Sequence, residues 1–226
     1  MLPILAVTGL AKEARLAAGP GVEAVGAGGS PQRLRLLLDA RPEPSCRAVV
    51  SFGIAGGLDP ALVPGDVVLG TGIRAGDRRF PTDAAVTGAL AERLRRLDAR
   101  VVQADLAGVD AAVLTLAGKA SLRAATGAAA VDMESHVAAA YAARHGLPFA
   151  ALRVVCDPAG RALPAFVAHA LKPDGEPDIL AVLSALLRGK ARPGELFRLA
   201  RDSAAAFKAL SACRQALGEG LGVPPA

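Results

Sequence analysis

Two nearby segments decide how this chain folds: residues 131–135, with the sequence VDMES, and residues 147–158, with the sequence LPFAALRVVCDP. A helical pattern connects them and stops at Gly146 and Pro148. The carboxylates of this region, one methionine and one arginine lie at the ends of apolar segments. Acidic groups at strand ends face a crevice more often than a core, so chemistry is expected in this part of the chain.

The composition of the 226 residues is that of one globular α/β domain, since 52% are hydrophobic and 21% are charged. Aromatic residues make up only 3%, with no tryptophan, which argues against stacking platforms for single-stranded nucleic acid. The net charge is +5, but the arginines are scattered, and the densest group (Arg93, Arg95 and Arg96) fits a solvated helix face. No nucleic-acid partner is therefore expected.

Cysteine usage and the pattern of apolar runs predict a cytoplasmic protein. Cys46, Cys156 and Cys213 are far apart and show neither a disulfide framework nor zinc-ligand spacing. The N-terminus lacks a basic region before its apolar run, and no apolar run reaches about 18 residues without a charge. Neither a signal peptide nor a transmembrane helix is expected.

Apolar strand patterns alternate with helical spacing along the chain. Strands are expected at residues 3–9, 22–26, 47–53, 66–73, 101–109, 111–116 and 149–157, and helices at 31–40, 82–99 and 134–145. Residues 161–217 have a mainly helical pattern, broken near 173–177 and 192–194, and residues 218–226 should fray. This order predicts an α/β fold, a three-layer α/β/α arrangement around a central mixed sheet, as a single domain over residues 1–226. The ligand crevice is expected at the carboxyl ends of the strands, where Gly9, Gly53 and Asp157 fall.

Residues 51–58, with the sequence SFGIAGGL, form a glycine-rich segment after a predicted strand. Its glycines would let backbone N–H groups approach an anion or a sugar closely. No Gly-Lys-Ser/Thr follows, and the spacing is not that of a dinucleotide fingerprint. A tight turn between two strands and a ligand loop fit this spacing equally well.

Four acidic side chains are candidates for chemistry, and each has a structural alternative. Asp132 and Glu134 could complement a helix dipole or accept hydrogen bonds from a ribose diol, with Met133 in the core or under the sugar. Asp157 closes an apolar strand, where burial would raise its pKa and let it protonate a leaving group; an Asp-Pro turn is the alternative. Glu13 follows the first strand and could also be a solvent-facing helix residue paired with a neighbouring cation.

Together these motifs resemble those of the nucleoside phosphorylase/methylthioadenosine nucleosidase superfamily. The shared pieces are GIAGGLDP at 53–60, PGDVV at 64–68, VDMES at 131–135, and PF with RVVCD between 148 and 157, in the family's order and spacing. The resemblance covers residues 3–158. The sequences DMESH at 132–136, CDPA at 156–159 and RALP at 161–164 are most similar to the hopanoid-associated phosphorylases.

The resemblance implies a phosphorylase/hydrolase-like fold and assigns roles in breaking a glycosidic bond. Asp157 would be the general acid at purine N7, Glu134 would bind the ribose hydroxyls, and Met133 would pack against the sugar. Cleavage passes through an oxocarbenium-like state, which needs a protonated leaving group and a fixed sugar with negative charge beside it.

Further positions complete the site that the resemblance implies. Arg153 would hold the surrounding carboxylates, and the backbone around Leu116 would line the base pocket. Glu13 matches the position that activates water in the nucleosidases. Gly9 and Asp132, which is shorter than the glutamate usual at its position, complete the predicted substrate-binding set. No metal or organic cofactor is implied.

Departures from the family pattern leave the nucleophile open. Ile54 stands where relatives carry Ser or Thr, and Ser51 stands where some phosphorylases carry a phosphate-binding arginine. Phosphate as co-substrate would have to be held by Ser51, by backbone N–H groups of Gly53, Ile54 and Gly56, or by an arginine of residues 74–79. Water activated by Glu13 is the alternative.

The function that the resemblance implies is cleavage of adenosylhopane in hopanoid biosynthesis, with adenine released and phosphorolysis favoured. A polycyclic lipid tail needs an apolar groove or a membrane-facing mouth, for which residues 163–171 and Leu196-Phe197 are candidates, with ordinary helix packing as the alternative. A cytoplasmic homodimer with peripheral contact at the inner membrane face is then expected. A hydrolytic methylthioadenosine/S-adenosylhomocysteine-type nucleosidase and a non-catalytic nucleoside-binding protein are the alternatives.

Overall fold

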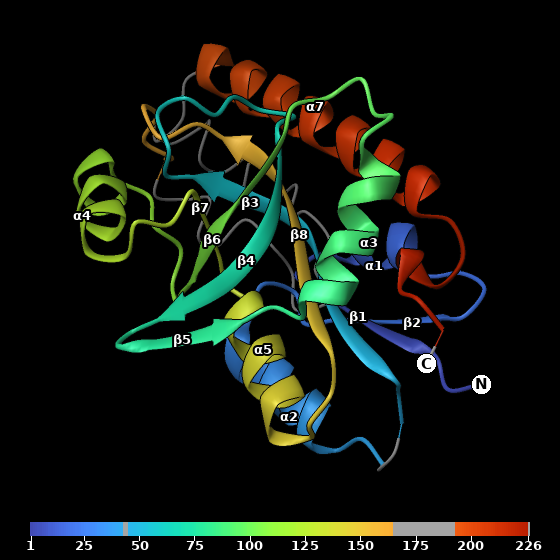
Figure 1. Ribbon diagram of the computed structural model, residues 1–226. Helices are drawn as coiled ribbons and strands as arrows, with labels where there is room; N and C mark the ends of the chain where they lie inside the picture. The colour runs from blue at the N-terminus through green and yellow to red at the C-terminus, as the bar shows by residue number, and fades with distance from the viewer. Residues whose placement is uncertain (43–44, 165–192, 226) are drawn as a thin grey trace.

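The computed structural model describes residues 1–42, 45–164 and 193–225 (Figure 1). The strands are β1 (Ile4–Thr8), β2 (Val22–Gly26), β3 (Ala48–Gly57), β4 (Val67–Ala75), β5 (Arg78–Pro81), β6 (Val101–Gly108), β7 (Ala130–Asp132) and β8 (Phe149–Asp157). The helices are α1 (Ala11–Ala17), α2 (Pro31–Asp39), α3 (Ala84–Leu94), α4 (Leu116–Thr126), α5 (Ser135–Arg144) and α7 (Pro193–Leu217), followed by a 3₁₀ turn, η2 (Glu219–Gly222). The predicted α/β class with a central mixed sheet is confirmed.

The strands form one sheet in the order β2-β1-β3-β7-β6-β4-β5, and β8 pairs with both β3 and β4. The β1–β2, β1–β3, β3–β8, β4–β6 and β6–β7 pairs are parallel, and the β3–β7, β4–β5 and β4–β8 pairs are antiparallel. Strands β3, β8, β4, β6 and β7 therefore close into a ring, because β7 pairs back onto β3. This closure puts the end of β3 beside the ends of both β7 and β8.

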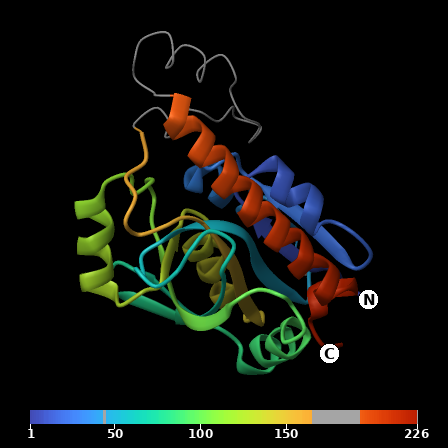
Figure 2. The same ribbon diagram turned by 90° about the horizontal axis from the view of Figure 1, so that it is seen from above.

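Helices cover the sheet on both faces. Helices α1, α3 and α7 pack on one face, with α7 lying across the molecule in Figure 2, and α2 and α5 pack on the other. Along β1, Ile4 and Ala6 face the first layer together with Leu210 of α7, and Leu5 and Val7 face the second. Burial on both faces explains why this strand is apolar throughout, without polar alternation.

Helix α4 stands apart from the other helices at one edge of the molecule (Figures 1 and 2). It begins at a cap, in which the hydroxyl of Thr115 accepts a hydrogen bond from the N–H of Gly118 at 3.0 Å, and it ends at Gly127 with φ 68°. Lys119 is its buried residue, whereas the other α4 residues are half-buried or exposed. Lys119 is therefore the residue of α4 that enters the protein interior.

The glycine-rich segment is neither a turn nor a loop, because β3 continues through it to Gly57. Ile54 and Ala55 pair with β8, and Gly56 pairs with Val131 of β7 on its other side. Pairing with β8, joined by β7 at Gly56 and Gly57, extends the strand through the glycines, and this outweighs the usual preference of glycine for turns.

Other local predictions were wrong at segment ends. Residues 111–116 form no strand, since Thr115 caps α4 directly after them. The short strands β5 and β7 and the helices α1 and α4 were not predicted. Residues 218–225 do not fray: Leu221 is fully buried, and Arg47 donates to the carbonyl of Val223 at 3.2 Å. The helical tail is confirmed from Pro193 onward, while the predicted breaks near 173–177 and residues 165–171 of the predicted lipid groove lie outside the described residues.

Candidate active site

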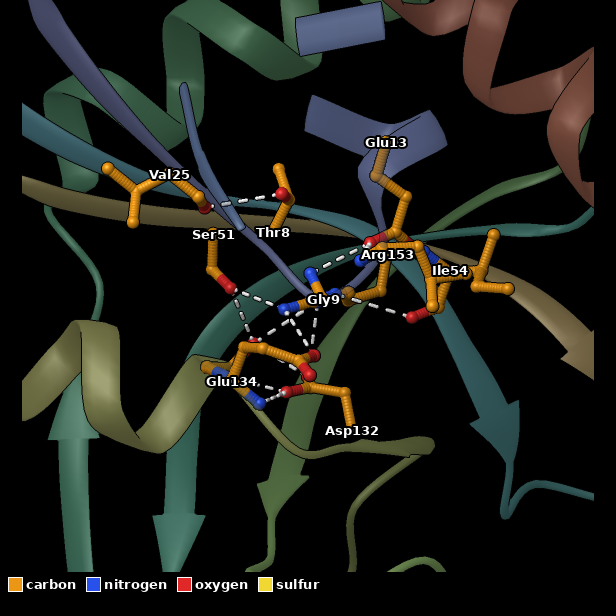
Figure 3. A network of polar contacts seen from close by, with 11 residues as sticks. Thr8, Gly9, Glu13, Val25, Ser51, Ile54, Asp132, Glu134 and Arg153 are labelled. Atoms are coloured by element: carbon orange, nitrogen blue, oxygen red, sulfur yellow. Dashed lines mark hydrogen bonds and ion pairs between the residues drawn. The ribbon is translucent and has the colours of Figure 1, made fainter. Parts of the chain in front are cut away.

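The carboxylate of Glu13 is held by backbone donors (Figure 3). Its Oε2 accepts hydrogen bonds from the N–H groups of Gly9 and Leu10, both at 2.8 Å, and its Oε1 accepts one from Ile54 at 2.7 Å. A carboxylate offers about four lone-pair positions, so Oε1 keeps room for a further donor such as water. Glu13 is buried, so it is not the solvent-facing residue of the alternative prediction. Burial raises its pKa, and the charge of Arg153 and the backbone donors oppose that rise.

The guanidinium of Arg153 on β8 joins the acidic groups into one network (Figure 3). It is fully buried, with Nε 3.2 Å from Oδ2 of Asp132 and Nη2 3.5 Å from Oε2 of Glu134. Nη2 also donates to the hydroxyl of Ser51 at 2.6 Å, and Nη1 donates to the carbonyl of Ile54 at 3.3 Å. A planar, permanently charged group with several donors suits such a cluster of acceptors. Arg153 thus contacts the carboxylates that the sequence predicted it would hold.

Asp132 shapes the turn between β7 and α5. Its Oδ1 accepts hydrogen bonds from the N–H groups of Glu134 at 2.8 Å and Ser135 at 2.6 Å, and its Oδ2 accepts the Ser135 hydroxyl at 2.6 Å. The Ser135 hydroxyl lies 2.9 Å from that of Ser51, which links the turn to β3. These contacts favour the helix-start alternative for Asp132 over direct binding of a sugar.

Two glycines let the carboxylates approach the strands. A Cβ on Gly9 would lie 2.7 Å from Oε1 of Glu134. A Cβ on Gly53 would lie 2.6 Å from both Oε1 of Glu13 and Nη1 of Arg153. Since real Cβ atoms do not come that close, a side chain at either position would displace the network. These predicted site residues therefore act by leaving space.

Several carboxylates around one arginine compete for its charge. Burial raises the pKa of Glu134 to about 8; Arg153 opposes this rise, and the charges of Asp132 and Glu13 add to it. Glu134 can therefore exchange a proton near neutral pH, which is typical of groups in active sites.

Asp157, at the end of β8, is held by a residue that the sequence did not predict. Its Oδ2 pairs with the ammonium of Lys119 in α4, and Lys119 also donates to the carbonyl of Pro158 at 2.9 Å. A Cβ on Gly56 would lie 3.3 Å from the same carboxylate oxygen. Burial raises the pKa of Asp157, while Lys119 and then Arg161 lower it. An aspartate placed in this way can hold and release a proton.

The two parts of the site lie along the same pair of strands. Arg153 and Asp157 are both on β8, and their partners Gly53 and Gly56 are both on β3. The thiol of Cys156 lies in the electric field of both Asp157 and Glu13, and burial raises its pKa to about 12.

The residues expected around the base and the sugar face are more open. Leu116 begins α4 and is 49% exposed, and Met133 is half-buried directly before Glu134. The N–H of Leu163 donates to the carbonyl of Leu114 at 2.8 Å. The segment after β8 therefore lies along the residues that were expected to line the base pocket.

Much of the predicted phosphate region is used by internal contacts. The Ser51 hydroxyl is fully buried against Arg153, and the N–H of Ile54 donates to Glu13. Gly56 lies within β3 between two neighbouring strands. The Ser51 hydroxyl and the Ile54 N–H, which could have bound phosphate, are thus engaged in contacts within the protein.

Two of the three arginines in residues 74–79, Arg74 and Arg79, are also paired with a carboxylate, whereas Arg78 lies over the ring of Phe80. Nε and Nη2 of Arg79 donate to both carboxylate oxygens of Asp105, at 2.8 and 2.7 Å, and Nε of Arg74 donates to Oδ2 at 3.0 Å. The Arg79 bonds, with those from Thr71 and Arg74, lower the pKa of Asp105 to about 2. These guanidinium groups stabilise the β4–β5 hairpin against β6.

Sequence reasoning missed Lys119 and Ser135. A lone lysine in a helix is normally solvated, so nothing in residues 116–126 indicated that Lys119 is buried. Ser135 was quoted only as part of a motif, although a serine three residues after an aspartate at a helix start is a plausible capping partner. Among the described residues, no group of three or more His, Cys, Asp or Glu side chains is placed to hold a metal ion.

Residues 17–189 match the family model described as the phosphorylase superfamily. The chain belongs to this superfamily. Three solved structures share the fold of this phosphorylase-superfamily member at 15–20% sequence identity. A search of curated proteins found no match.

The three structures are nucleosidases or hydrolases by name. The 5′-methylthioadenosine/S-adenosyl homocysteine nucleosidase of Helicobacter pylori has a TM-score of 0.67 and 15% identity, covering 94% of this chain and 97% of its own. The futalosine hydrolase of H. pylori has a TM-score of 0.65 and 16% identity, covering 84% and 96%. A Colwellia psychrerythraea MTA/SAH nucleosidase in complex with adenine has a TM-score of 0.62 and 20% identity, covering 88% and 96%. These similarities show the superfamily fold, and the site geometry must carry the function.

Proposed function

We propose that this superfamily member cleaves the N-glycosidic bond of an adenine nucleoside with water as nucleophile. The observation that carries the proposal is the contact set of Glu13, whose buried carboxylate keeps a lone pair of Oε1 beside the Arg153 network. Asp157 supplies a second buried carboxyl with a raised pKa from the end of β8. The fold is shared with nucleosidases, one of them solved with adenine bound, which supports the same substrate class.

The two carboxyl groups act on opposite ends of the broken bond. Asp157 donates its proton to N7 of the purine as the C1′–N9 bond breaks, and the electron pair of that bond leaves with neutral adenine. Glu134 accepts hydrogen bonds from the ribose hydroxyls and stabilises the positive charge that develops on the sugar. Glu13 takes a proton from water, whose oxygen bonds to C1′. The sum is nucleoside plus water giving adenine plus the free sugar.

Phosphorolysis is the second candidate, and the similarity to hopanoid-associated phosphorylases at residues 132–136, 156–159 and 161–164 favours it. Phosphate would replace water at the same face of the sugar. The commitment of the Ser51 hydroxyl and the Ile54 N–H to internal contacts is the observation that ranks it below hydrolysis.

Measurement of adenine and sugar products separates these candidates. The protein, dialysed free of phosphate, is incubated with adenosine or 5′-methylthioadenosine, with and without added phosphate. Hydrolysis predicts the same rate in both conditions and a free reducing sugar. A rate increase of about tenfold or more with phosphate, together with a sugar 1-phosphate product, contradicts water as the nucleophile. Absence of adenine release from every nucleoside, adenosylhopane included, contradicts glycosidic cleavage itself.

For the 5′ substituent we propose a bulky apolar group, with adenosylhopane as the candidate that the sequence motifs favour. A hollow of about 370 Å³ follows the acid and is lined by Arg161, Ala162, Leu163, Pro164, Glu195, Arg198 and Leu199. Phe197 at the start of α7 is 72% exposed, which fits a surface for a lipid. Equal rates for adenosylhopane and 5′-methylthioadenosine, with no sedimentation on anionic liposomes, would exclude this substrate and its role in hopanoid biosynthesis.

Assembly and membrane contact are proposed on the resemblance alone. A homodimer is expected in solution, and light scattering after size exclusion measures it. Within the part of the chain that the structure describes, no helix combines the length and the apolar character that crossing a bilayer requires. Peripheral contact through the apolar substituent's groove is what the liposome experiment tests.

A further inference from the structure

Lys119 is a buried cation on a helix whose other residues are half-buried or exposed. Its relative exposure is 1%. Taking an ammonium out of water costs several kcal/mol unless its partners are well placed, so buried lysines are rare without a specific partner. The partner here is the carboxylate that the proposed mechanism uses as its proton donor.

The contacts of Lys119 converge on the end of β8. Its ammonium pairs with Oδ2 of Asp157 and donates to the carbonyl of Pro158 at 2.9 Å. These two contacts fix both the carboxylate and the backbone directly after it. One side chain from α4 therefore contacts both the Asp157 carboxylate and the backbone beyond it.

Lys119 is one of several residues that attach α4 to the rest of the fold. Arg123, on the same helix, pairs with Asp59 at 3.2 Å and donates to the carbonyl of Ala128 at 3.4 Å. Leu122 packs on a small apolar cluster that includes Leu58. The attachment of α4 is therefore shared among several contacts, whereas the ammonium of Lys119 is directed at Asp157 and Pro158.

We propose that Lys119 is a positioning residue of the glycosidic cleavage, which holds the Asp157 carboxyl toward the leaving base and stabilises the carboxylate left after proton transfer. The inference rests on the proposed function. The proton that reaches N7 comes from Asp157, and the ammonium of Lys119 pairs with the carboxylate that remains. Proton transfer to the base thus leaves an ion pair in place of an isolated buried anion.

The charges around Asp157 set the expected pH effect. Lys119 faces it from α4, the Cys156 thiol is its neighbour on β8, and Arg161 follows in the next loop, paired with Asp202 of α7. Lys119 is the largest influence that lowers the pKa of Asp157 against the effect of burial. Removing it should raise that pKa further and weaken the acid.

The test compares two leaving groups in Lys119→Met and in Arg123→Met, a control that removes a cation from the same helix. The substrates are 5′-methylthioadenosine and 4-nitrophenyl β-D-ribofuranoside, whose nitrophenolate leaves without a proton. In Lys119→Met, adenine release should fall by about 10- to 100-fold, with the alkaline limb of its pH profile moved to higher pH. Nitrophenolate release should stay within about threefold of the parent rate. Arg123→Met should leave both rates and the pH profile unchanged.

The outcomes separate this inference from the proposed function. Release of neither leaving group by the parent protein, together with no adenine release from adenosylhopane, contradicts the proposed function itself. An active parent with a Lys119→Met variant that loses both substrates equally, or keeps the parent pH limb, overturns the role of Lys119 alone. If Lys119→Met does not fold, Lys119→Arg is tested in its place. This variant keeps the positive charge, so adenine release alone should fall and the alkaline limb of the pH profile should not move. An equal loss on both substrates contradicts the inference.

Discussion

Glu13 and Asp157 carry the two proton transfers of the proposed reaction, and the fold holds them in different ways. Glu13 is bound by backbone N–H groups at the end of β1, at the start of α1 and in β3. Asp157 is bound by the side chain of Lys119, which comes from a helix at the edge of the molecule. The first arrangement follows from the path of the chain, and the second depends on one residue.

This difference indicates which of the two proton transfers a single substitution disturbs more readily: the activation of water by Glu13 or the protonation of the base by Asp157. Backbone donors stay in place when a side chain changes, so the nucleophile side should tolerate most substitutions around it. The leaving-group side should change with Lys119 and with the position of α4. The predictions below are ordered from the largest expected effect to the smallest.

Asp157→Asn should have the largest effect on turnover. An amide cannot donate the proton that the purine needs, so kcat for adenine release should fall by about 10²- to 10⁴-fold. Release of nitrophenolate from the nitrophenyl riboside should change little, because that group needs no proton. Equal losses on both substrates would mean that Asp157 acts by holding the site together.

Arg153→Met should have the largest effect on stability. It leaves the buried carboxylates of Asp132 and Glu134 without their cation, and breaking a buried pair costs about 3–5 kcal/mol. Urea unfolding followed by circular dichroism measures the loss. Arg123→Met is the matched control, since its partly exposed pair should contribute about 1 kcal/mol or less. Similar losses of unfolding free energy in the two variants would show that the Arg153 network contributes no more to stability than an exposed ion pair.

Glu13→Gln should reduce turnover by about 10²-fold on both the adenine and the nitrophenyl substrate, because both need the same activated water. The amide keeps the shape of the side chain but accepts no proton from water. Steady-state kinetics on the two substrates, beside Asp157→Asn, tests this distinction. A loss confined to the adenine substrate would place Glu13 on the leaving-group side.

Gly53→Ala should reduce turnover by about tenfold and stability by about 1–3 kcal/mol, because its Cβ would lie 2.6 Å from Glu13 and Arg153. Gly88→Ala is the matched control: a Cβ there meets no atom within 4 Å, and alanine favours the helix. Thermal melting and kcat of both variants give the comparison. A Gly53→Ala variant as stable and active as Gly88→Ala would show that the network can move without cost.

The smallest effect should appear in the pH dependence of stability. The pKa of Glu134 is about 8 in the folded protein, above its ordinary value of 4.5, so its contribution to stability is present at low pH and is lost as pH rises toward 8. Glu13 and Asp157, whose pKa values are also raised, act in the same direction. Urea unfolding between pH 6 and 8.5 should show falling stability, with a smaller slope in Glu134→Gln. Asp105, with a pKa of about 2, stays ionised in this range. An equal slope in the variant contradicts the assignment to Glu134.

The sequence predicted much of the fold because the apolar patterns are strong where burial is complete. The predicted range at 149–157 coincides with β8, in which every residue except Cys156 is buried. The predicted range at 22–26 also coincides with β2, although only Val22 of that strand is buried. The strand predicted at 111–116 was wrong because a short apolar run that leads into a helix cap resembles a buried strand. The η2 turn was missed because Leu221 is buried by distant partners, which local sequence does not show.

Within the site, predictability followed the kind of contact. Glu134 and Arg153 lie at the ends of recognisable segments, and the structure brings them together. The burial of Lys119 depends on where α4 packs, and no local pattern encodes that. The hydrogen bond from the Ile54 N–H to Glu13 likewise joins two segments that are 41 residues apart in the sequence.

One irregularity in β8 has a consequence for how its length can vary. Ala55 pairs with Val155 and Gly56 with Asp157, so Cys156 is an unpaired extra residue in the ladder. The side chain of Cys156 packs in the layer that contains α7, and that of Val155 packs in the opposite layer. Consecutive side chains here therefore point to opposite faces of the sheet. Adding or removing one residue between Arg153 and Asp157 would move the carboxyl to the opposite face of the strand and away from Lys119. The function proposed for this strand therefore depends on which face each side chain occupies. A change of one residue in its length would remove that function even if Asp157 itself were kept.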